Sequence, residues 1–285
     1  MAMGRSDVRL LIFGLGYTAQ VLAARVRGAG GVVVGTTRDG RDGTIRFEDA
    51  AAVALELGVA THILCSVPPA GEVDPVLVAY GPSLSASGAW LGYLSSTGVY
   101  GDAGGAWVDE SAAIGRGRRN ARAEADAAWQ AIGARVFRLP GIYGPGRSPL
   151  DRVASGSAHR VIAPGQVFSR AHVDDIVSGV IAGFDAPAGA YNIADDCPAS
   201  QNAVVEYAAR MLGMAPPPIV PLDALSPMAQ GFYAENRRVA NGKAKRVLGW
   251  TPLYPDYRAG LRALSAMMSP PITKAAPAPV SGDQR

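Results

Sequence analysis

Short apolar runs alternate with segments of helical periodicity in the first half of the chain. The apolar runs, each of which predicts a β-strand, cover residues 8–13, 32–35, 61–67, 90–96 and 134–140. Because these runs carry few polar residues, both faces of the strands are expected to be buried, as in a parallel sheet. Helical spacing over 17–28 and 119–132 predicts right-handed crossovers between the strands. The pattern therefore predicts an α/β fold with a doubly wound parallel sheet of the Rossmann type.

The pattern changes after about residue 145, where Gly and Pro become frequent and single helices replace the strand–helix alternation. These helices are predicted over 172–184, 199–213 and 240–248. The expected organisation is a Rossmann core over 1–145, a mixed C-terminal lobe over 146–268 that is interleaved with the last strands and helices of the core, and a disordered tail over 269–285.

The composition narrows the class of protein. The 285 residues are 48% hydrophobic and 18% charged, which excludes a largely disordered chain. No apolar run reaches the roughly 18 residues that span a bilayer, and the run at 8–13 is too short for a secretory signal. The net charge of +3 comes from scattered basic residues, so neither nucleic acid nor membrane is expected as a partner. Cys65 and Cys197 show no disulfide or metal-ligand spacing, and a reducing, cytoplasmic location is predicted.

A glycine-rich turn follows the first predicted strand. Gly14 permits the tight turn, Gly16 has no Cβ and lets a pyrophosphate approach the backbone, and Ala19 allows close packing of helix on strand. The helix that opens at Tyr17 and Thr18 directs its free amides and its dipole toward the same point. This strand–turn–helix context predicts a site for a dinucleotide cofactor.

The residues after the second strand bear on which dinucleotide binds. About 20 residues past the glycines, an acidic residue would bind the ribose 2′-hydroxyl of NAD. The chain has Thr36, Thr37 and Arg38 there, and a planar guanidinium with hydroxyls suits a 2′-phosphate. NADP is therefore the preferred cofactor, while Asp39 keeps NAD open.

Five motifs in order resemble those of a known family. They are WLGYLSSTGVYG (90–101), RLPGIYGPGR (138–147), RAHVDDIV (170–177), YNIADD (191–196) and NGKAKRVLGWTP (241–252). With the glycine-rich turn, they make the chain resemble an atypical extended short-chain dehydrogenase/reductase of the NAD-dependent epimerase and dehydratase group. The resemblance implies a Rossmann domain followed by a small substrate lobe. Members often pair through helices of the Rossmann domain, which by analogy implies a homodimer.

The resemblance also implies where cofactor and substrate would lie. Cofactor contacts are implied at the ends of the fourth, fifth and sixth strands, at Ser66, Val67, Pro68, Ser95, Pro140 and Ile142. Ser96 matches the family's catalytic hydroxyl, which hydrogen-bonds the reacting oxygen, and the adjacent Thr97 could substitute for it. A hydroxyl is a poor general acid alone, because its pKa lies far from 7. The alternative is that these hydroxyls only cap the end of the strand.

The family's proton donor, a Tyr four residues before a Lys, is missing from this chain. Aligning Glu124 with the acid that usually follows this pair puts Arg116 in place of the Tyr and Asn120 in place of the Lys. No Lys precedes residue 243, so no shift of the alignment restores the pair. Asn120 could still hold the cofactor ribose.

Other side chains could supply the proton or bind substrate. Tyr100, Tyr143 or a water positioned by an Arg could act as the acid, and Tyr143 could also contact substrate. The cations that could bind an anionic substrate or cofactor group are Arg116, Arg118, Arg119, Arg122, Arg147, Arg170 and Arg237. The cluster within 116–122 could equally form a solvated helix face. His172 precedes Asp174 and Asp175 at the start of a predicted helix, and a structural role is expected for it.

These features predict an NAD(P)-binding oxidoreductase, reductase-like or epimerase-like, that acts on a small carbonyl or alcohol substrate. The alternative is a non-catalytic NAD(P)-dependent sensor or scaffold, because the usual acid is absent. The sequence lacks the motifs of other enzyme classes. The three histidines lack metal-ligand spacing, and neither a nucleophile elbow nor a P-loop lysine motif is present.

Overall fold

The computed structural model describes residues 7–115, 117 and 120–268. The expectations for Arg116, Arg118 and Arg119, and for a disordered tail over 269–285, lie outside the described residues.

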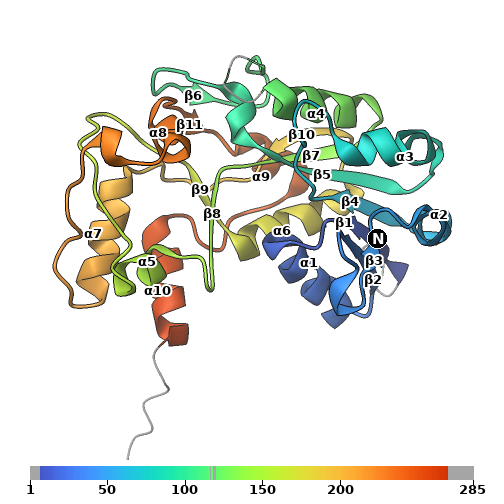
Figure 1. The fold of residues 1–285 in the computed structure, drawn as a ribbon, viewed down its shortest axis with the longest axis horizontal. Coiled ribbons are helices and arrows are strands. Elements are labelled where there is room, and N and C mark those ends of the chain that lie inside the picture. The colour runs from blue at the N-terminus through green and yellow to red at the C-terminus, as the bar shows by residue number, and fades with distance from the viewer. Residues whose placement is uncertain (1–6, 116, 118–119, 269–285) are drawn as a thin grey trace, which may run out of the picture.

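A seven-stranded sheet forms the centre of the fold (Figure 1). Its order is β10-β7-β5-β4-β1-β2-β3, and every pair of neighbouring strands is parallel. The strands are β1 (Arg9–Phe13), β2 (Val32–Thr37), β3 (Ile45–Arg46), β4 (His62–Cys65), β5 (Trp90–Ser96), β7 (Arg135–Leu139) and β10 (Gly189–Asn192). This arrangement confirms the parallel Rossmann-type sheet predicted from the apolar runs.

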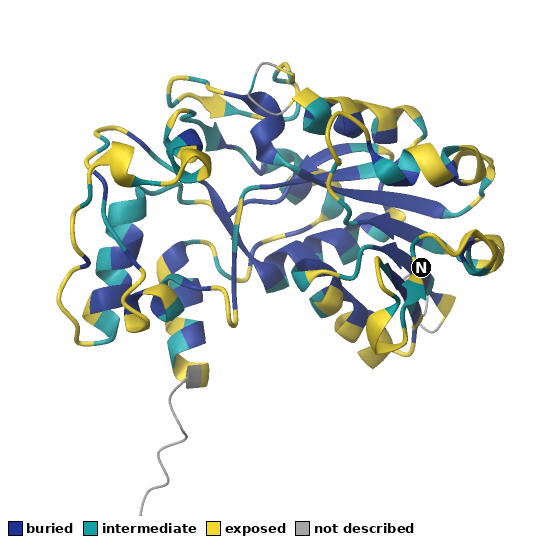
Figure 2. Cartoon of the chain, viewed as in Figure 1, coloured by how far each residue is buried: buried dark blue, intermediate teal, exposed yellow. Residues whose placement is uncertain are grey.

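Helices cover both faces of this sheet. Successive residues of a strand point to opposite faces, so Leu10 and Ile12 of β1 pack on one side while Leu11 and Phe13 pack on the other. The first face is covered by α1 (Tyr17–Gly28), α6 (Val173–Ala182) and α9 (Gly242–Leu248). The second is covered by α2 (Ala50–Val59), α3 (Pro75–Ala86) and α4 (Asn120–Ala131). Figure 2 shows the strands as the buried centre between helices whose outer sides are exposed.

A smaller lobe lies beside the carboxyl ends of the strands (Figure 1). Its core is formed by α5 (Pro149–Ala154), α7 (Gln201–Met211) and α10 (Tyr257–Met268), which bury Leu150, Val204 and Leu261 against one another. The remaining elements are α8 (Pro227–Tyr233), the pairs β6 (Trp107–Val108) with β11 (Arg238–Val239) and β8 (Gly141–Tyr143) with β9 (Arg170–His172), and the 3₁₀ turns η2 (Arg41–Gly43), η3 (Thr97–Tyr100), η4 (Gly183–Asp185) and η5 (Leu222–Ala224).

The lobe and the sheet are interleaved along the chain. After β7 the chain forms β8, α5 and β9 and then returns, so that α6 packs on α1 and β10 pairs with β7 at the sheet edge. It then leaves again to form α7 and α8 before α9 comes back to the sheet. The division of the chain at residue 145 stays a prediction. Among the described residues, no helix is long and apolar enough to cross a membrane.

Candidate active site

A cleft of about 940 Å³ opens at the carboxyl ends of the strands, between the sheet and the smaller lobe. This edge is where open parallel sheets bind their ligands. Of the sequence-predicted residues, those that line the cleft are Thr18, Ser66, Ser95, Ser96, Thr97, Arg122, Pro140, Ile142, Tyr143, Arg147, Arg170 and Arg237. Predicted residues that the structure describes outside the lining are Gly14, Gly16, Tyr17, Thr37, Arg38, Val67, Pro68, Tyr100 and Asn120.

The glycine-rich turn has the shape that a pyrophosphate needs. Gly14 has φ +83°, and a Cβ there would meet Val67 Cγ2 at 2.7 Å. A Cβ at Gly16 would meet nothing within 4 Å, so the backbone is open on that side. No side chain caps α1, and its first internal hydrogen bond runs from Gln20 N to the Gly16 carbonyl. The amides of the first turn therefore have no acceptor within the helix, and the turn fits a dinucleotide pyrophosphate.

The start of α1 is tied to the turn that follows β8. Tyr17 donates its hydroxyl hydrogen bond to the Pro145 carbonyl at 3.0 Å. The guanidinium of Arg147 lies 5.7 Å from the centroid of the Tyr17 ring. The Tyr17 hydroxyl is therefore engaged with the lobe, and the exposed Arg147 carries its charge beside the glycine-rich turn.

The loop after β2 holds the other predicted cofactor contacts. Thr37 Oγ1 lies 2.7 Å from Thr44 Oγ1 and accepts a hydrogen bond from Gly40 N at 3.0 Å. The hydroxyl of Thr37 thus fixes the loop itself. Arg38 is exposed on this loop, where its guanidinium is available to a phosphate.

Two hydroxyl groups meet the cleft at the end of β5. Ser96 is half-buried, and its Oγ accepts a hydrogen bond from Gly98 N at 3.1 Å, which caps η3. Thr97 is 5% exposed and lines the same cleft. The capping role and a role toward a ligand are therefore compatible for Ser96, because its Oγ can still donate a hydrogen bond while it accepts one.

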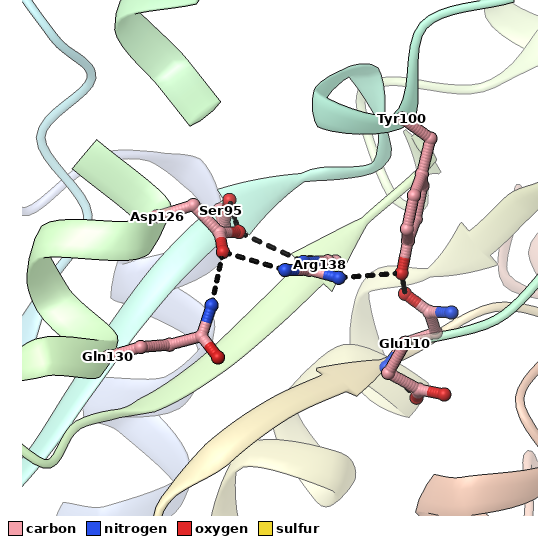
Figure 3. A network of polar contacts seen from close by, with 7 residues as sticks. Ser95, Tyr100, Glu110, Asp126, Gln130 and Arg138 are labelled. Atoms are coloured by element: carbon pink, nitrogen blue, oxygen red, sulfur yellow. Dashed lines mark hydrogen bonds and ion pairs between the residues drawn. The ribbon is translucent and has the colours of Figure 1, made fainter. Parts of the chain in front are cut away.

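A buried polar network includes Ser95, the residue before Ser96 (Figure 3). Ser95 donates to Asp126 Oδ2 at 2.6 Å, and Arg138 binds both oxygens of Asp126 at 3.0 and 2.8 Å. Arg138 also donates to the Tyr100 hydroxyl at 2.9 Å, which in turn donates to Asn192 Oδ1 at 2.7 Å. The Arg138 and Asp126 side chains are 3% and 0% exposed. The network fixes the end of β5 to α4, β7 and β10.

This geometry does not support Tyr100 as the proton donor. Its hydroxyl lies in the buried network, and burial is the main cause that raises the pKa of Tyr100 to about 12. Tyr143 is also buried, with its ring in edge contact with His172 at 5.2 Å. The Tyr143 hydroxyl has no hydrogen-bond partner among the described residues, and burial raises its pKa strongly. Neither tyrosine would release a proton readily near neutral pH.

The first two turns of α4 show which face meets the site. Glu124 is exposed, whereas Asp126 is the buried acid of this helix. The acid that orders the helix therefore lies two residues after the one used in the sequence alignment. Asn120 is exposed and lies outside the lining, while Arg122 is half-buried and lines the cleft. With Asp126 as the reference in place of Glu124, the position that the sequence alignment gave to Asn120 moves to Arg122, and the one given to Arg116 moves to 118, outside the described residues.

Two of the predicted substrate arginines are engaged by the protein itself. Arg170 is 7% exposed and donates to two backbone carbonyls and to Gln201 Oε1. Arg237 donates to the Gly101 carbonyl at 2.7 Å and to Glu235 Oε2 at 2.9 Å. Their guanidinium groups therefore shape the wall of the cleft. Arg147 is exposed and makes no ion pair with a described carboxylate.

His172 has the structural place that the sequence favours. It is fully buried, and its Nδ1 accepts a hydrogen bond from Asp174 N at 3.2 Å, which caps α6. Among the described residues, no three potential metal ligands cluster together.

The lobe contributes lining residues that the sequence analysis did not single out. They include Arg152 on α5, His159, Phe168 and Tyr233, and the rings of Phe168 and Tyr233 meet edge to face at 5.4 Å. The one local signal was the Ser148-x-x-Asp151 capping box that starts α5. Nothing in the sequence indicated that these segments converge on one cleft.

Comparison with known proteins places the chain among Rossmann-fold relatives. No protein-family model matches it. A Silicibacter pomeroyi protein of unknown function is 41% identical, with a TM-score of 0.84 over 91% of this chain and 99% of that one. The chain belongs to the same family as this Silicibacter protein.

More distant structures share the fold. A Helicobacter pylori ADP-L-glycero-D-manno-heptose-6-epimerase has a TM-score of 0.74 at 15% identity, over 94% of this chain and 98% of that one. The human epimerase family protein SDR39U1, solved with NADPH, has a TM-score of 0.72 at 15% identity, over 91% and 99%. These neighbours show that the chain has the fold that the resemblance implied.

A curated sequence relative matches part of the chain. It is a Streptomyces 3-diazoavenalumate denitrifying reductase, 34% identical over 140 residues. The match covers 44% of this chain and 45% of that protein, so the chain spans less than half of the length of this relative.

Proposed function

We propose that the protein is an NAD(P)H-dependent reductase of a small carbonyl compound, with NADP as the preferred cofactor. The observation that carries the proposal is that Thr18 at the start of α1, Ser66 after β4 and Ser96 at the end of β5 line one cleft. Thr18 follows directly on the glycine turn that suits a pyrophosphate, and Ser96 offers a hydroxyl suited to a reacting oxygen. The NADPH-bound human neighbour and the Streptomyces reductase support the same class of chemistry.

The residues of the chain would have the following roles in binding and reduction. The amides that follow Gly16 bind the pyrophosphate, and Arg38 binds the 2′-phosphate beside the loop held by Thr37. Further cofactor contacts come from the strand ends, at Ser66, Val67, Pro68, Ser95, Pro140 and Ile142. When bound, the reduced nicotinamide supplies the hydride. Ser96 orients the substrate oxygen through its Oγ, with Thr97 beside it, and Arg147 faces an anionic part of the substrate.

Arg38 gives a test of the cofactor assignment. Thermal unfolding is followed with NADPH, with NADH and without cofactor, where a ligand about 100-fold above its Kd stabilises the fold by about 2.7 kcal/mol. Arg38→Ala is expected to weaken the binding of NADPH and to leave the binding of NADH unchanged, because only NADPH carries the phosphate that the guanidinium binds. Equally weakened binding of both cofactors would contradict the role of Arg38 toward the 2′-phosphate. Tighter binding of NADH than of NADPH by the wild type would assign NAD as the cofactor instead of NADP.

A substitution of Ser96 distinguishes an enzyme from a non-catalytic sensor. NADPH oxidation is followed against a panel of aldehydes and ketones, with an aryl diazonium salt included because the Streptomyces relative is named for a diazo substrate. Ser96→Ala is expected to lower kcat by about 10²–10³-fold while the Kd for NADPH stays unchanged, since one hydrogen bond to the developing oxyanion is lost. Tight NADPH binding without turnover on any substrate would favour the non-catalytic sensor.

A further inference from the structure

The first turn of α4 lies against the end of β5. Helix α4 packs on η3, the turn that begins directly after Ser96, and Ala123 is buried there against Val99 and Tyr100. One turn further, Asp126 accepts the hydrogen bond from Ser95. Residues four apart share a face of a helix, so Arg122 lies on the face of α4 that meets the end of β5. Arg122 and Ser96 both line the cleft there.

Arg122 makes no ion pair with a carboxylate that the structure describes. Asp126 is bound through both oxygens by Arg138. Asp74 caps α3 through hydrogen bonds from Val76 N and Leu77 N and accepts a third from Trp129 Nε1. Asp74 and Asp126 are therefore engaged by other groups, while Arg122 is half-buried and lines the cleft.

The charge of Arg122 acts at the ends of two central strands. Burial raises the pKa of Cys65 at the end of β4 and of Tyr93 on β5, and the positive charge of Arg122 opposes both shifts. The charge of this guanidinium thus acts at the carboxyl end of β4 and at the middle of β5, where the charge of Asp74 acts in the opposite direction. A half-buried cation is costly unless a negative charge meets it, and near a protein surface that attraction is stronger than in bulk solvent.

Carbonyl reduction produces such a negative charge. Hydride from the dihydronicotinamide adds to the carbonyl carbon, the π electron pair moves to the oxygen, and an alkoxide forms as the cofactor is oxidised. A proton from solvent then converts the alkoxide to the alcohol. Because Arg stays protonated at any working pH, it cannot be the proton donor, but it can stabilise the alkoxide.

We propose that Arg122 contacts the reacting oxygen together with Ser96 and stabilises its developing charge, in place of the missing acid. This inference rests on the proposed reductase function. The cofactor pyrophosphate belongs at the start of α1, beside Arg147, and the reacting end of the cleft is at β5, beside Arg122. Arg147, beside the start of α1, faces an anionic part of the substrate, whereas Arg122 faces the reacting oxygen.

The test compares Arg122→Ala and Arg122→Lys with Arg246→Ala, an exposed arginine on α9 outside the cleft lining. Arg122→Ala is expected to lower kcat by about 10²–10³-fold, with the Kd for NADPH and the unfolding temperature unchanged. Added guanidinium chloride at millimolar concentration is expected to restore part of the kcat of Arg122→Ala and none of that of Ser96→Ala. Arg122→Lys should keep part of the rate but lose it above about pH 10, where a lysine deprotonates. Arg246→Ala should match the wild type.

Each contrary outcome has a distinct meaning. A wild type that binds NADPH but reduces no substrate overturns the proposed function and this inference with it. A wild type that turns over, with Arg122→Ala equally fast, overturns the inference alone. So does a folded Arg122→Ala variant whose loss lies wholly in NADPH affinity, or whose kcat does not respond to guanidinium.

Discussion

Removal of the buried carboxylate of Asp126 should destabilise the fold far more than removal of a carboxylate from a surface ion pair. Asp126 is fully buried and binds Arg138, whose side chain is 3% exposed, through both oxygens. In Asp126→Ala the guanidinium stays buried with the Tyr100 hydroxyl as its remaining partner, and Ser95 loses its acceptor. Breaking such a pair by removing one member costs about 3–5 kcal/mol.

The loss of stability depends on how deeply the ion pair is buried and not on the distance between its charged atoms. The Arg9–Glu56 pair is as close, at 2.7 Å against 2.8 Å, but its side chains are 36% and 19% exposed. Glu56→Ala should therefore cost at most about 1 kcal/mol. At roughly 2–4 °C per kcal/mol for a chain of this size, Asp126→Ala should lower Tm by roughly 6–20 °C and Glu56→Ala by a few degrees at most.

Urea or thermal unfolding followed by circular dichroism measures both variants. A second substitution, Arg138→Met in the Asp126→Ala background, should recover stability because it removes the uncompensated buried charge. Equal and small losses for Asp126→Ala and Glu56→Ala, with no gain from Arg138→Met, would refute the reasoning that burial sets the cost.

Two further predictions concern single positions. Burial lowers the pKa of His172 below its usual value near 6.5. As pH falls below about 6.5, the unfolded chain is therefore protonated at His172 while the folded chain is not, and the free energy of unfolding decreases. His172→Asn, which keeps a capping side chain, should therefore flatten the acid loss of stability by up to about 1.4 kcal/mol per pH unit in urea titrations, and identical slopes would contradict this. Gly14→Ala should lower stability by about 1–2 kcal/mol, because φ is +83° and the Cβ would meet Val67 Cγ2 at 2.7 Å. Gly16 has φ −87° and open space around its Cα, so Gly16→Ala should leave Tm unchanged but weaken the binding of NADPH. A lower Tm with unchanged NADPH affinity would argue against the pyrophosphate site.

The central part of the fold could be predicted from the sequence because β1, β4, β5 and β7 are buried on both faces. The apolar run 90–96 coincides with β5, and the helical spacing over 17–28 coincides with α1. The predicted helix 119–132 differs from α4 by one residue at each end. Continuous apolar runs and helical spacing are signals that do not depend on distant parts of the chain.

The site was only partly predictable, because its decisive contacts are long-range. The family resemblance pointed to Ser96, which lines the cleft, but the engagement of Tyr100 depends on Arg138 and on Asn192, 92 residues away. Likewise, only the buried position of Asp126 shows that Arg122, and not Asn120, meets the cleft. Periodicity places a residue on a helix, whereas packing decides which side of that helix is inward.

The return of the chain to the sheet has a consequence for engineering. Because β10 and α6 come after α5 and β9 in sequence yet complete the central sheet and its helical cover, a cut near residue 145 would leave β7 as a bare edge and α1 without its neighbour. Neither fragment would be a self-sufficient folding unit. Exchanging the lobe to alter specificity would thus require grafting separate insertions at matched junctions, with β10 and α6 retained from the recipient, instead of a single crossover between two genes.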